Sequence, residues 1–305
     1  MIVTSPMPTI AAVIVAKNEA DILDECLISL DGLVDEVIVV DLESTDGTRS
    51  LAARHGATVL QHPTVQYADS VRAIGMAHAR GDWILLLDPD ERIGSDLARE
   101  LRLLVNEDEC DVIFLPYVNS IFGRELRAPG AIEFHHPRLF RRGSLEWPTA
   151  IHTNPDVRGL RCHVVSGSDA GTGSCSVMHV PWRTPHQVLE KFSRYVHDEA
   201  ERRRAKGAKF GVGRMLYRLS REFGGRYVVG RCYEDGLPGL FFSAMYAAYE
   251  LGVQIELWQM EGSPARQDPW IRWSGRVVGE PMRWVLPLWM HRRRRTGVDG
   301  SQASE

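Results

Sequence analysis

The sequence predicts an α/β fold with a mostly parallel central sheet whose faces are covered by helices. In the first half of the chain, short runs rich in β-branched residues alternate with stretches of helical periodicity. Two of the predicted strands end in aspartate, as in sheets that bind ligands at their carboxyl edge. With 305 residues, 44% of them hydrophobic and 25% charged, the chain can bury a large core. This composition excludes disordered, collagen-like and coiled-coil proteins.

The first elements follow from periodicity and turn signals. Ile10–Ala16 is continuously apolar and predicts a buried strand. The apolar residues of 22–30 recur at helical spacing, and Val37–Asp41 predicts the next strand. A second unit repeats this order, with a helix over 48–55 that Thr48 is positioned to cap and a weaker strand over 58–61.

The alternation continues to about residue 117. Asp69–Ala79 predicts a helix and Trp83–Leu87 a strong strand. Ser95 is positioned to cap a further helix whose leucines lie on one face, and Val112–Tyr117 predicts one more strand.

After residue 117 the pattern changes. The segment 128–137 is rich in Pro and Gly, 138–141 is strand-like, and loops are expected to about Gly173. From Pro185 to Arg295 the sequence is helical and rich in Arg and Trp, and the last five residues are expected to fray.

The charge is distributed unevenly. Residues 1–180 hold 15 Lys and Arg against 26 Asp and Glu, whereas residues 181–305 hold 21 against 14. This split favours two functional faces. The acidic first part disfavours nucleic acid as its main partner, because phosphate backbones require clustered cations.

The cysteines and termini favour a cytoplasmic protein. The five cysteines are odd in number, far apart and without metal-ligand spacing, so we expect neither a disulfide framework nor a zinc site. The first nine residues lack the basic region of a signal peptide. The longest uncharged apolar stretch, 236–249, is short of the roughly 18–20 residues that cross a bilayer. A soluble or peripheral protein is therefore expected.

The strongest chemical signal is the run Asp88-Pro89-Asp90-Glu91 directly after the strand Trp83–Leu87. Asp41 ends another predicted strand, and ligands of open α/β sheets bind beyond the carboxyl ends of the strands. We therefore expect Asp41 and Asp88 to lie close together. Crowded carboxylates need a cation, and oxygen ligands favour Mg²⁺ or Mn²⁺ over zinc.

Simpler interpretations exist for single residues. Asp41 alone can end a strand and cap the next loop, although the nearby carboxylate run favours a site role. Glu91 can be the solvated start of a helix. His152 can be a loop or core histidine, which is the commoner fate of a single histidine.

With these residues the chain resembles the family 2 glycosyltransferases, whose nucleotide-sugar-binding fold is called GT-A. The resemblance covers about Ile10 to Tyr195, and the most similar branch is that of the bacterial lipopolysaccharide-core β-glucosyltransferases. The matching segments are Val15–Glu19 (VAKNE), Val39–Thr48 (VVDLESTDGT), Gly81–Glu91 (GDWILLLDPDE), Arg138–Gly143 (RLFRRG), and His179 with Lys191 and Tyr195 behind it.

The resemblance implies roles for individual residues. Asp41 would contact the base or ribose, and Asp88 the ribose and donor sugar. Asp90 would hold Mg²⁺ or Mn²⁺ on the diphosphate, with Asp88 beside it, and His179 would close the metal or diphosphate site. The residues that would border the base and ribose are Ala16, Lys17, Asn18 and Glu19.

Inverting transfer also needs a general base near the acceptor hydroxyl. The envelope branch usually has a His-Glu pair after RLFRRG, where this chain reads Ile151–Pro155 (IHTNP) and lacks the glutamate. The candidate bases are Glu91, Glu133, Glu146 and His152, and we favour His152 because it occupies the matching segment. A second departure is Gly75, where the family often has asparagine.

The resemblance implies a cytoplasmic, metal-dependent, inverting glycosyltransferase. It would move a hexose from a nucleoside diphosphate sugar, UDP-sugar above all, to a hydroxyl of a cell-envelope glycan or lipid-linked intermediate. Residues 1–180 would form the GT-A catalytic domain, and 181–305 a helical region that contacts the acceptor or the membrane. The tryptophans and arginines of 284–295 favour contact with an anionic membrane surface over a packed terminal helix.

Three alternatives remain open from the sequence. The first is a peptide- or natural-product-directed glycosyltransferase. The second is a sugar nucleotidyltransferase, although 15–19 lacks a Gly-rich phosphate loop. The third is a catalytically inactive GT-A scaffold, which the missing glutamate favours and the intact Asp88–Glu91 run disfavours.

Overall fold

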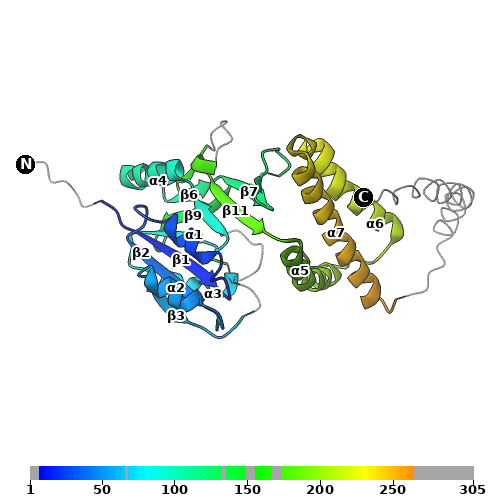
Figure 1. The fold of residues 1–305 in the computed structure, drawn as a ribbon, viewed down its shortest axis with the longest axis horizontal. Coiled ribbons are helices and arrows are strands. Elements are labelled where there is room, and N and C mark those ends of the chain that lie inside the picture. The colour runs from blue at the N-terminus through cyan, green and yellow to red at the C-terminus, as the bar shows by residue number, and fades with distance from the viewer. Residues whose placement is uncertain (1–6, 66–67, 132–134, 149–154, 167–172, 264–305) are drawn as a thin grey trace, which may run out of the picture.

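The computed structural model describes residues 7–65, 68–131, 135–148, 155–166 and 173–263. Helices α1 to α4 accompany the sheets, and α5 to α7 lie together beside this part of the molecule, joined to it through β11 (Figure 1). The strands are β1 (Ile10–Ala16), β2 (Glu36–Asp41), β3 (Thr58–Gln61), β4 (Trp83–Leu87), β5 (Glu91–Ile93), β6 (Val112–Leu115), β7 (Tyr117–Ile121), β8 (Arg124–Glu125), β9 (His136–Arg141), β10 (Cys162–Val164) and β11 (Val177–Trp182). The helices are α1 (Leu23–Ile28), α2 (Thr48–Arg54), α3 (Asp69–His78), α4 (Ser95–Glu107), α5 (Pro185–Ala205), α6 (Val212–Gly224) and α7 (Leu237–Met260), with the short helical turns η1 (Gly173–Cys175), η2 (Gly225–Val229) and η3 (Cys232–Asp235).

The larger sheet is mostly parallel, which confirms the predicted fold class. In the described ranges it has seven strands in the order β10-β6-β9-β4-β1-β2-β3. β1 pairs in parallel with β2 and β4, β2 with β3, and β6 with β10. β9 runs antiparallel between β4 and β6.

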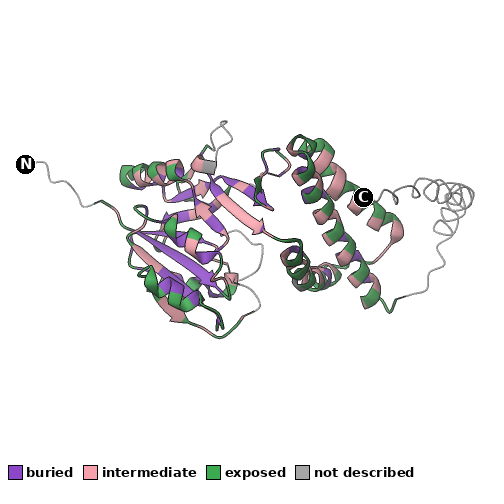
Figure 2. Cartoon of the chain, viewed as in Figure 1, coloured by how far each residue is buried: buried purple, intermediate pink, exposed green. Residues whose placement is uncertain are grey.

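The core lies on both faces of this sheet. Ile10, Ala12 and Ile14 of β1 belong to one buried cluster, and Ala11 and Val13 to another. Successive strand residues point to opposite faces, so a strand covered on both sides must be apolar throughout. The buried strands are the purple arrows in the left-hand part of Figure 2.

Gly75 allows α3 to pack closely on the sheet. A Cβ atom at this position would lie 2.4 Å from Cγ1 of Val13 and 3.2 Å from Cγ2 of Val40. The glycine that replaces the family's usual asparagine at this position therefore has a packing reason. No side chain fits between α3 and these strands unless the helix or the strands move.

A second sheet is the main element that the sequence did not predict. In the described part of the chain it has four strands in the order β5-β11-β7-β8. The prediction of one strand over Val112–Tyr117 was wrong, because β6 ends at Leu115 in the larger sheet and β7 begins at Tyr117 in the smaller one. Pro116, which has no backbone N–H, stands at this transition. The loops expected up to Gly173 contain β10 as well.

Two predicted helix caps were also wrong. The N-cap of α2 is Gly47 and that of α4 is Gly94, and neither makes a side-chain cap. Thr48 is the first residue of α2, and its backbone N–H donates to Oδ1 of Asp46 at 2.9 Å. The side-chain acceptor at this helix start is therefore an aspartate two residues earlier.

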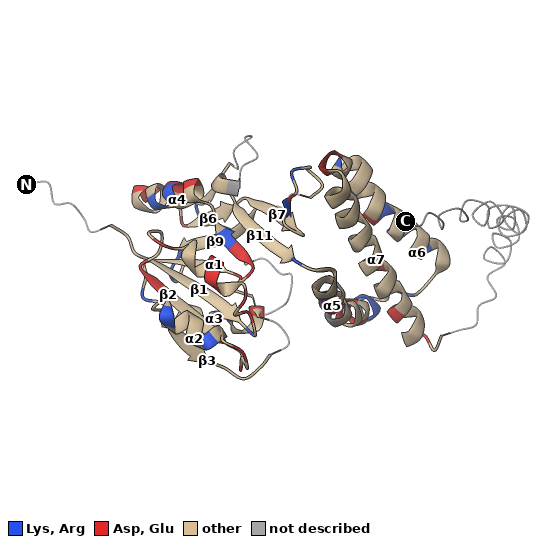
Figure 3. Ribbon diagram, in the orientation of Figure 1, with Lys and Arg blue, Asp and Glu red and all other residues tan. Residues whose placement is uncertain are grey.

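The helical part is held together by a buried ion pair. Glu250 of α7 is 3% exposed, and Nη1 of Arg203 on α5 lies 2.8 Å from each of its carboxylate oxygens. The charged residues of α5 are marked in Figure 3.

None of the helices in the described ranges is long and apolar enough to span a bilayer. The division at residue 180 stays a prediction, with β11 continuing to Trp182 and α5 beginning at Pro185.

Candidate active site

The loops after β1 and β2 are joined by hydrogen bonds. The backbone N–H of Asn18 donates to Oγ of Ser44 at 3.0 Å, and that of Thr45 donates to Oδ1 of Asn18 at 2.8 Å. The N–H of Glu19 donates to Oγ1 of Thr48 at 2.9 Å. Asn18 has a φ of 54°, in the left-handed region that asparagine tolerates better than most residues. The two segments predicted to border a nucleotide therefore lie side by side.

Asp41 is fully buried at the end of β2. Its Oδ2 accepts from the backbone N–H of Ser44 at 3.2 Å and lies 3.7 Å from Nε of Arg49. Its Oδ1 is also buried, and no hydrogen-bond donor reaches this atom from the residues described. Burying a carboxylate oxygen without a hydrogen-bond donor costs free energy. This atom is therefore suited to accept a hydrogen bond from a hydroxyl or N–H of a ligand.

Asp88 follows β4 and is held by two arginines. Nη2 of Arg72 on α3 donates to Oδ1 at 2.6 Å, and Nη2 of Arg138 on β9 donates to Oδ2 at 3.1 Å. Burial opposes ionisation of Asp88, but these arginines outweigh it and hold its pKa below the usual range. Both carboxylate oxygens thus already accept hydrogen bonds from cations.

Glu91 is buried at the start of β5, so its interpretation as the solvated start of a helix was wrong. Its Oε2 accepts from the backbone N–H of Asp88 at 2.8 Å, and its Oε1 accepts from Arg138 at 3.2 Å. Burial raises the pKa of Glu91 to about 7 against the opposing effect of Arg138. These contacts suit Glu91 to positioning Asp88 and Arg138; its role as a general base stays a prediction.

Asp90 faces a different set of groups. Nζ of Lys191 on α5 donates to its Oδ2 at 3.0 Å, and Nε2 of His179 on β11 lies 3.7 Å from the same oxygen. Burial opposes ionisation, but His179 and Lys191 together hold the pKa of Asp90 far below its usual range. Asp90 is therefore an anion that faces a histidine nitrogen and an ammonium group.

β11 and β7 position His179. β11 pairs with β5, where His179 is opposite Glu91, and with β7, where it is opposite Asn119. Nδ1 of His179 lies 2.9 Å from Oδ1 of Asn119. The backbone N–H of Val180 donates to the carbonyl of Asp90 at 2.8 Å, which ties this strand to the carboxylate run.

A cavity of 470 Å³ opens beside Asp90. The β1–α1 loop contributes Lys17, Asn18 and Glu19, and the segment from β11 to α5 contributes Arg183 and Lys191. Burial and the nearby Asp90 carboxylate raise the pKa of Glu19 to about 7. The lining holds three cationic side chains and four acidic ones, Glu19, Asp21, Asp90 and Glu190, and two of the cations, Arg183 and Lys191, are paired with Asp21 and Asp90. This mixed lining suits an anionic ligand that binds together with a divalent cation.

The residues around Asp90 suit a hard divalent cation. Magnesium is usually held by one or two protein carboxylates together with substrate phosphates, and Mn²⁺ likewise favours carboxylate oxygens. A histidine nitrogen is a secondary ligand for such ions, so Asp90 would be the main protein ligand. A carboxylate oxygen of Asp90 and Nε2 of His179 face each other at 3.7 Å beside the cavity. Among the side chains that the structure describes, no group of three His, Cys, Asp or Glu residues is placed to hold a metal. Phosphate oxygens would therefore supply the remaining ligands.

Of the remaining candidate bases, the structure describes only Glu146. Glu146 is exposed, and its neighbour Trp147 lies 5.4 Å from the guanidinium of Arg72. His152 and Glu133 lie outside the described residues. Sequence reasoning assigned no role to Arg72, Arg138 or Asn119. In one sequence, nothing separates Arg72 and Asn119 from other helix and strand residues. Arg138 does begin the RLFRRG segment, which was the available signal.

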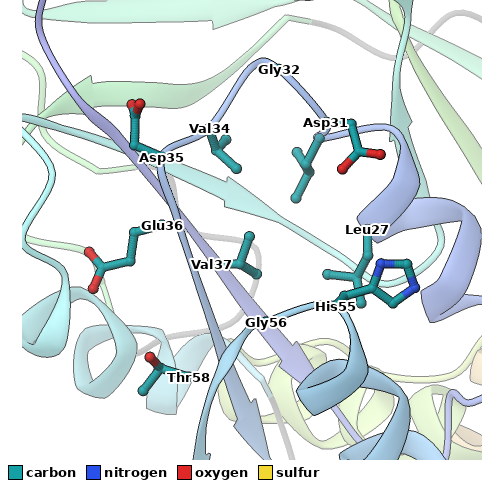
Figure 4. A pocket seen from close by; sticks show the side chains of 11 residues that line it. Leu27, Asp31, Gly32, Val34, Asp35, Glu36, Val37, His55, Gly56 and Thr58 are labelled. Carbon is teal, nitrogen blue, oxygen red and sulfur yellow. The ribbon is translucent and has the colours of Figure 1, made fainter.

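A second cavity, of 300 Å³, lies at the opposite end of β2 (Figure 4). Its polar lining already has structural contacts. Oδ2 of Asp35 accepts from the backbone N–H of Ile10 at 2.8 Å, and Nε2 of His55 lies 2.8 Å from Asp24. This cavity is at the amino end of the parallel strands, away from the edge where ligands of such sheets bind.

Comparison with known proteins decides the family. The family model described as "Glycosyl transferase family 2" matches residues 11–165. The chain belongs to this family. As a family 2 glycosyltransferase it is a transferase of GT-A fold, as the sequence predicted.

Curated relatives agree with this assignment. An uncharacterized glycosyltransferase of Rickettsia typhi, RT0209, is 34% identical over 253 residues, which is 79% of this chain and 84% of the relative. The lipopolysaccharide core biosynthesis glycosyltransferase LpsC of Rhizobium meliloti is 24% identical over 272 residues, 86% of this chain and 96% of LpsC. Five further curated relatives match over only about a third of their own length, from 27% to 36%.

Among the solved structures to which the chain is similar is that of S. aureus TarS 1-349 in complex with UDP-GlcNAc. It is 14% identical, covers 83% of this chain and 92% of that chain, and superposes with a TM-score of 0.47.

Proposed function

We propose that the protein is an inverting, metal-dependent glycosyltransferase that moves a hexose from a UDP-sugar to a hydroxyl of a cell-envelope glycan or lipid-linked intermediate. The observation that carries the proposal is the meeting of Asp90, His179 and Lys191 at the carboxyl end of β4, beside a cavity lined by both cationic and acidic side chains. Family membership makes the chain a transferase, and this geometry indicates where the donor would lie.

The donor nucleotide is assigned to the loops after β1 and β2. The segment Ala16 to Glu19 would border the base and ribose, and the buried Oδ1 of Asp41 would accept a hydrogen bond from them. Asp88, oriented by Arg72 and Arg138, would accept from ribose and sugar hydroxyls. Lys17, Arg183 and Lys191 would face the diphosphate.

Asp90 and His179 would hold Mg²⁺ or Mn²⁺, with Asp88 in a supporting position. A bound divalent cation neutralises the charge that develops on the departing nucleoside diphosphate. Lys191 adds a positive charge on the same side of Asp90 and would stabilise the same leaving group.

A general base must accept the proton of the acceptor hydroxyl while the anomeric carbon passes through an oxocarbenium-like state. We assign this role to the segment between β9 and β10, with His152 as the base and Glu146 as the alternative. The support for this assignment is Trp147, a described residue of the same segment. Its ring lies beside Arg72, and Arg72 donates a hydrogen bond to Asp88.

Substitution of the base residues tests this assignment. Hydrolysis of UDP-glucose, UDP-galactose and UDP-N-acetylglucosamine is measured as UDP release, with water taking the hexose in place of the acceptor hydroxyl and giving its proton to the base. The proteins compared are the wild type, His152→Ala, Glu146→Ala and the exposed control Glu107→Ala on α4. Loss of the base should lower the rate by about 10²–10⁴-fold without loss of UDP affinity, with the control unchanged.

Equal rates in all four proteins would overturn both base assignments. Binding of UDP by the wild type without UDP release from any of the three donors would support the inactive scaffold instead, which the missing glutamate after His152 favours.

The acceptor proposal rests on the likeness to LpsC and on the helical part. Leu237, Phe241, Leu251 and Ile255 are 65%, 46%, 37% and 45% exposed, and their spacing places them on one face of α7. We assign this face, with the basic segment 284–295 outside the described residues, to an anionic membrane surface on the cytoplasmic side.

Sedimentation with vesicles of anionic lipid should pellet the protein but not Phe241→Ser/Ile255→Ser. Equal pelleting of both proteins would count against this contact.

A further inference from the structure

We propose that Asn119 is the positioning residue that turns Nε2 of His179 toward Asp90, where this nitrogen would act as a metal ligand. The inference rests on the proposed metal-dependent function and adds the group that prepares the metal site. Asn119 lies on β7, beside β11, and contacts neither Asp90 nor the cavity directly in the contacts described.

The amide of Asn119 has a single consistent orientation. The side chain is fully buried, and its Nδ2 donates to the carbonyl of Ala131 at 2.7 Å. The amide oxygen therefore points the other way, to Nδ1 of His179 at 2.9 Å. Because a carbonyl oxygen only accepts, Nδ1 of His179 must carry the proton in this pair. The hydrogen-bond network thus assigns the tautomer.

This tautomer determines what His179 presents to Asp90. Beside the ionised Asp90 and without a metal, Nε2 also donates toward the carboxylate, so the ring is then an imidazolium. When a metal displaces the Nε2 proton, the proton held on Nδ1 by Asn119 leaves the Nε2 lone pair for the metal. Nε2 lies 3.7 Å from Oδ2 of Asp90, and Asp90 in turn lines the cavity. Metal-binding histidines in proteins are oriented in this way by a carbonyl or carboxylate on their other nitrogen, and loss of that partner costs about 10–100-fold in metal affinity.

The strands fix the ring as well as its tautomer. Asn119 and His179 are opposite each other in the parallel β7–β11 pair. The ring of Tyr117 meets that of His179 edge to face, with 6.5 Å between centroids. The imidazole is therefore confined by packing on one side and by Asn119 at Nδ1.

A purely structural role for Asn119 makes a different prediction. Its donation to Ala131 could serve only to fix the chain before β9. Asn119→Leu removes both hydrogen bonds, whereas Asn119→Asp keeps the acceptor for Nδ1 and loses the donor to Ala131. If the bond to His179 matters for the metal, Asp rescues the site; if only the bond to Ala131 matters, Asp fails as Leu does.

The experiment uses the full chain and two readouts. Long-range ¹H–¹⁵N spectra at pH 8.5, above the ordinary histidine pKa of about 6.5, report which ring nitrogen carries the proton, and His179→Gln identifies the signal. Mn²⁺ affinity is measured by electron paramagnetic resonance in the presence of UDP. We expect the Nδ1–H form in the wild type and Asn119→Asp, mixed tautomers in Asn119→Leu, and about 10–100-fold weaker Mn²⁺ binding in Asn119→Leu alone.

Three results would overturn the inference. They are an Nε2–H tautomer in the wild type, unchanged Mn²⁺ affinity in Asn119→Leu, and equal loss of affinity in both variants. Circular dichroism spectra of the variants show that they are folded before these values are compared. Each result can occur in a protein that binds Mn²⁺ and releases UDP from a UDP-sugar, so failure of this inference is distinguishable from failure of the proposed function.

Discussion

Asp88 and Asp90 carry the same group two positions apart, but their neighbours give them different chemistry. Asp88 is held by two arginines, whereas Asp90 accepts a hydrogen bond from a lysine and lies close to a histidine. The sequence predicted the cluster from a carboxylate run after a buried strand. It did not predict the arginines, because Arg72 and Arg138 are 16 and 50 residues from Asp88 and carry no local pattern.

Gly75 offers a test of packing at a single residue. In Gly75→Ala the new methyl group would lie 2.4 Å from Cγ1 of Val13, so α3 or β1 must move. We expect the free energy of unfolding, measured in urea, to fall by about 1–3 kcal/mol. Gly75→Ala combined with Val13→Ala should destabilise less than the sum of the two single changes, because Val13→Ala removes the clashing atom.

Gly213 on α6 is the matched control. An added Cβ there meets no atom within 4 Å among the described residues. Gly213→Ala should raise the free energy of unfolding by up to about 1 kcal/mol, as alanine does in a helix. A Gly75→Ala protein that is as stable as Gly213→Ala would contradict the close approach of α3 to the sheet.

Among the elements, the long buried strands were predictable and the short ones were not. β1 and β4 are apolar throughout and match their predicted bounds. β5 and β8 have three and two residues, too few for a periodic signal, and together with β7 and β11 they form the second sheet. The sheet that positions His179 and Asn119 was therefore missed although His179 itself was identified.

The edge of the larger sheet should respond to acid. Arg161, next to β10, donates to both carboxylate oxygens of Asp111, next to β6, at 2.7 Å and 3.1 Å. These bonds lower the pKa of Asp111 to about 2, below its value of about 3.8 in the unfolded chain. The native state therefore gains stability from ionised Asp111 above pH 4, and this gain is lost as the pH falls from about 4 to about 2.

Asp111→Asn isolates this contribution. The difference in free energy of unfolding between wild type and variant should be constant above pH 5 and shrink between pH 4 and pH 2. A difference that stays constant down to pH 2 would show that ionised Asp111 does not stabilise this edge.

At the scale of the whole molecule, the cavity joins the two parts of the chain. One side comes from the β1–α1 loop, and the other comes from the segment that leaves β11 and enters α5. The sequence predicted a change from α/β to helical structure near residue 180, but gave the helical part only an acceptor or membrane role. Lys191 and Arg183 show that this part also supplies charge to the candidate donor site.

Titration calorimetry of UDP binding, with and without Mn²⁺, tests the central claim most directly. We compare the wild type with Asp90→Asn and with Asp96→Asn, an aspartate in the first turn of α4 that serves as the control. The wild type and the control should bind UDP at least about tenfold more tightly with Mn²⁺, and Asp90→Asn should lose that gain because the main charged ligand is gone. UDP affinity that is indifferent to Mn²⁺, or equally metal-dependent in Asp90→Asn, would contradict a metal-bound donor at Asp90.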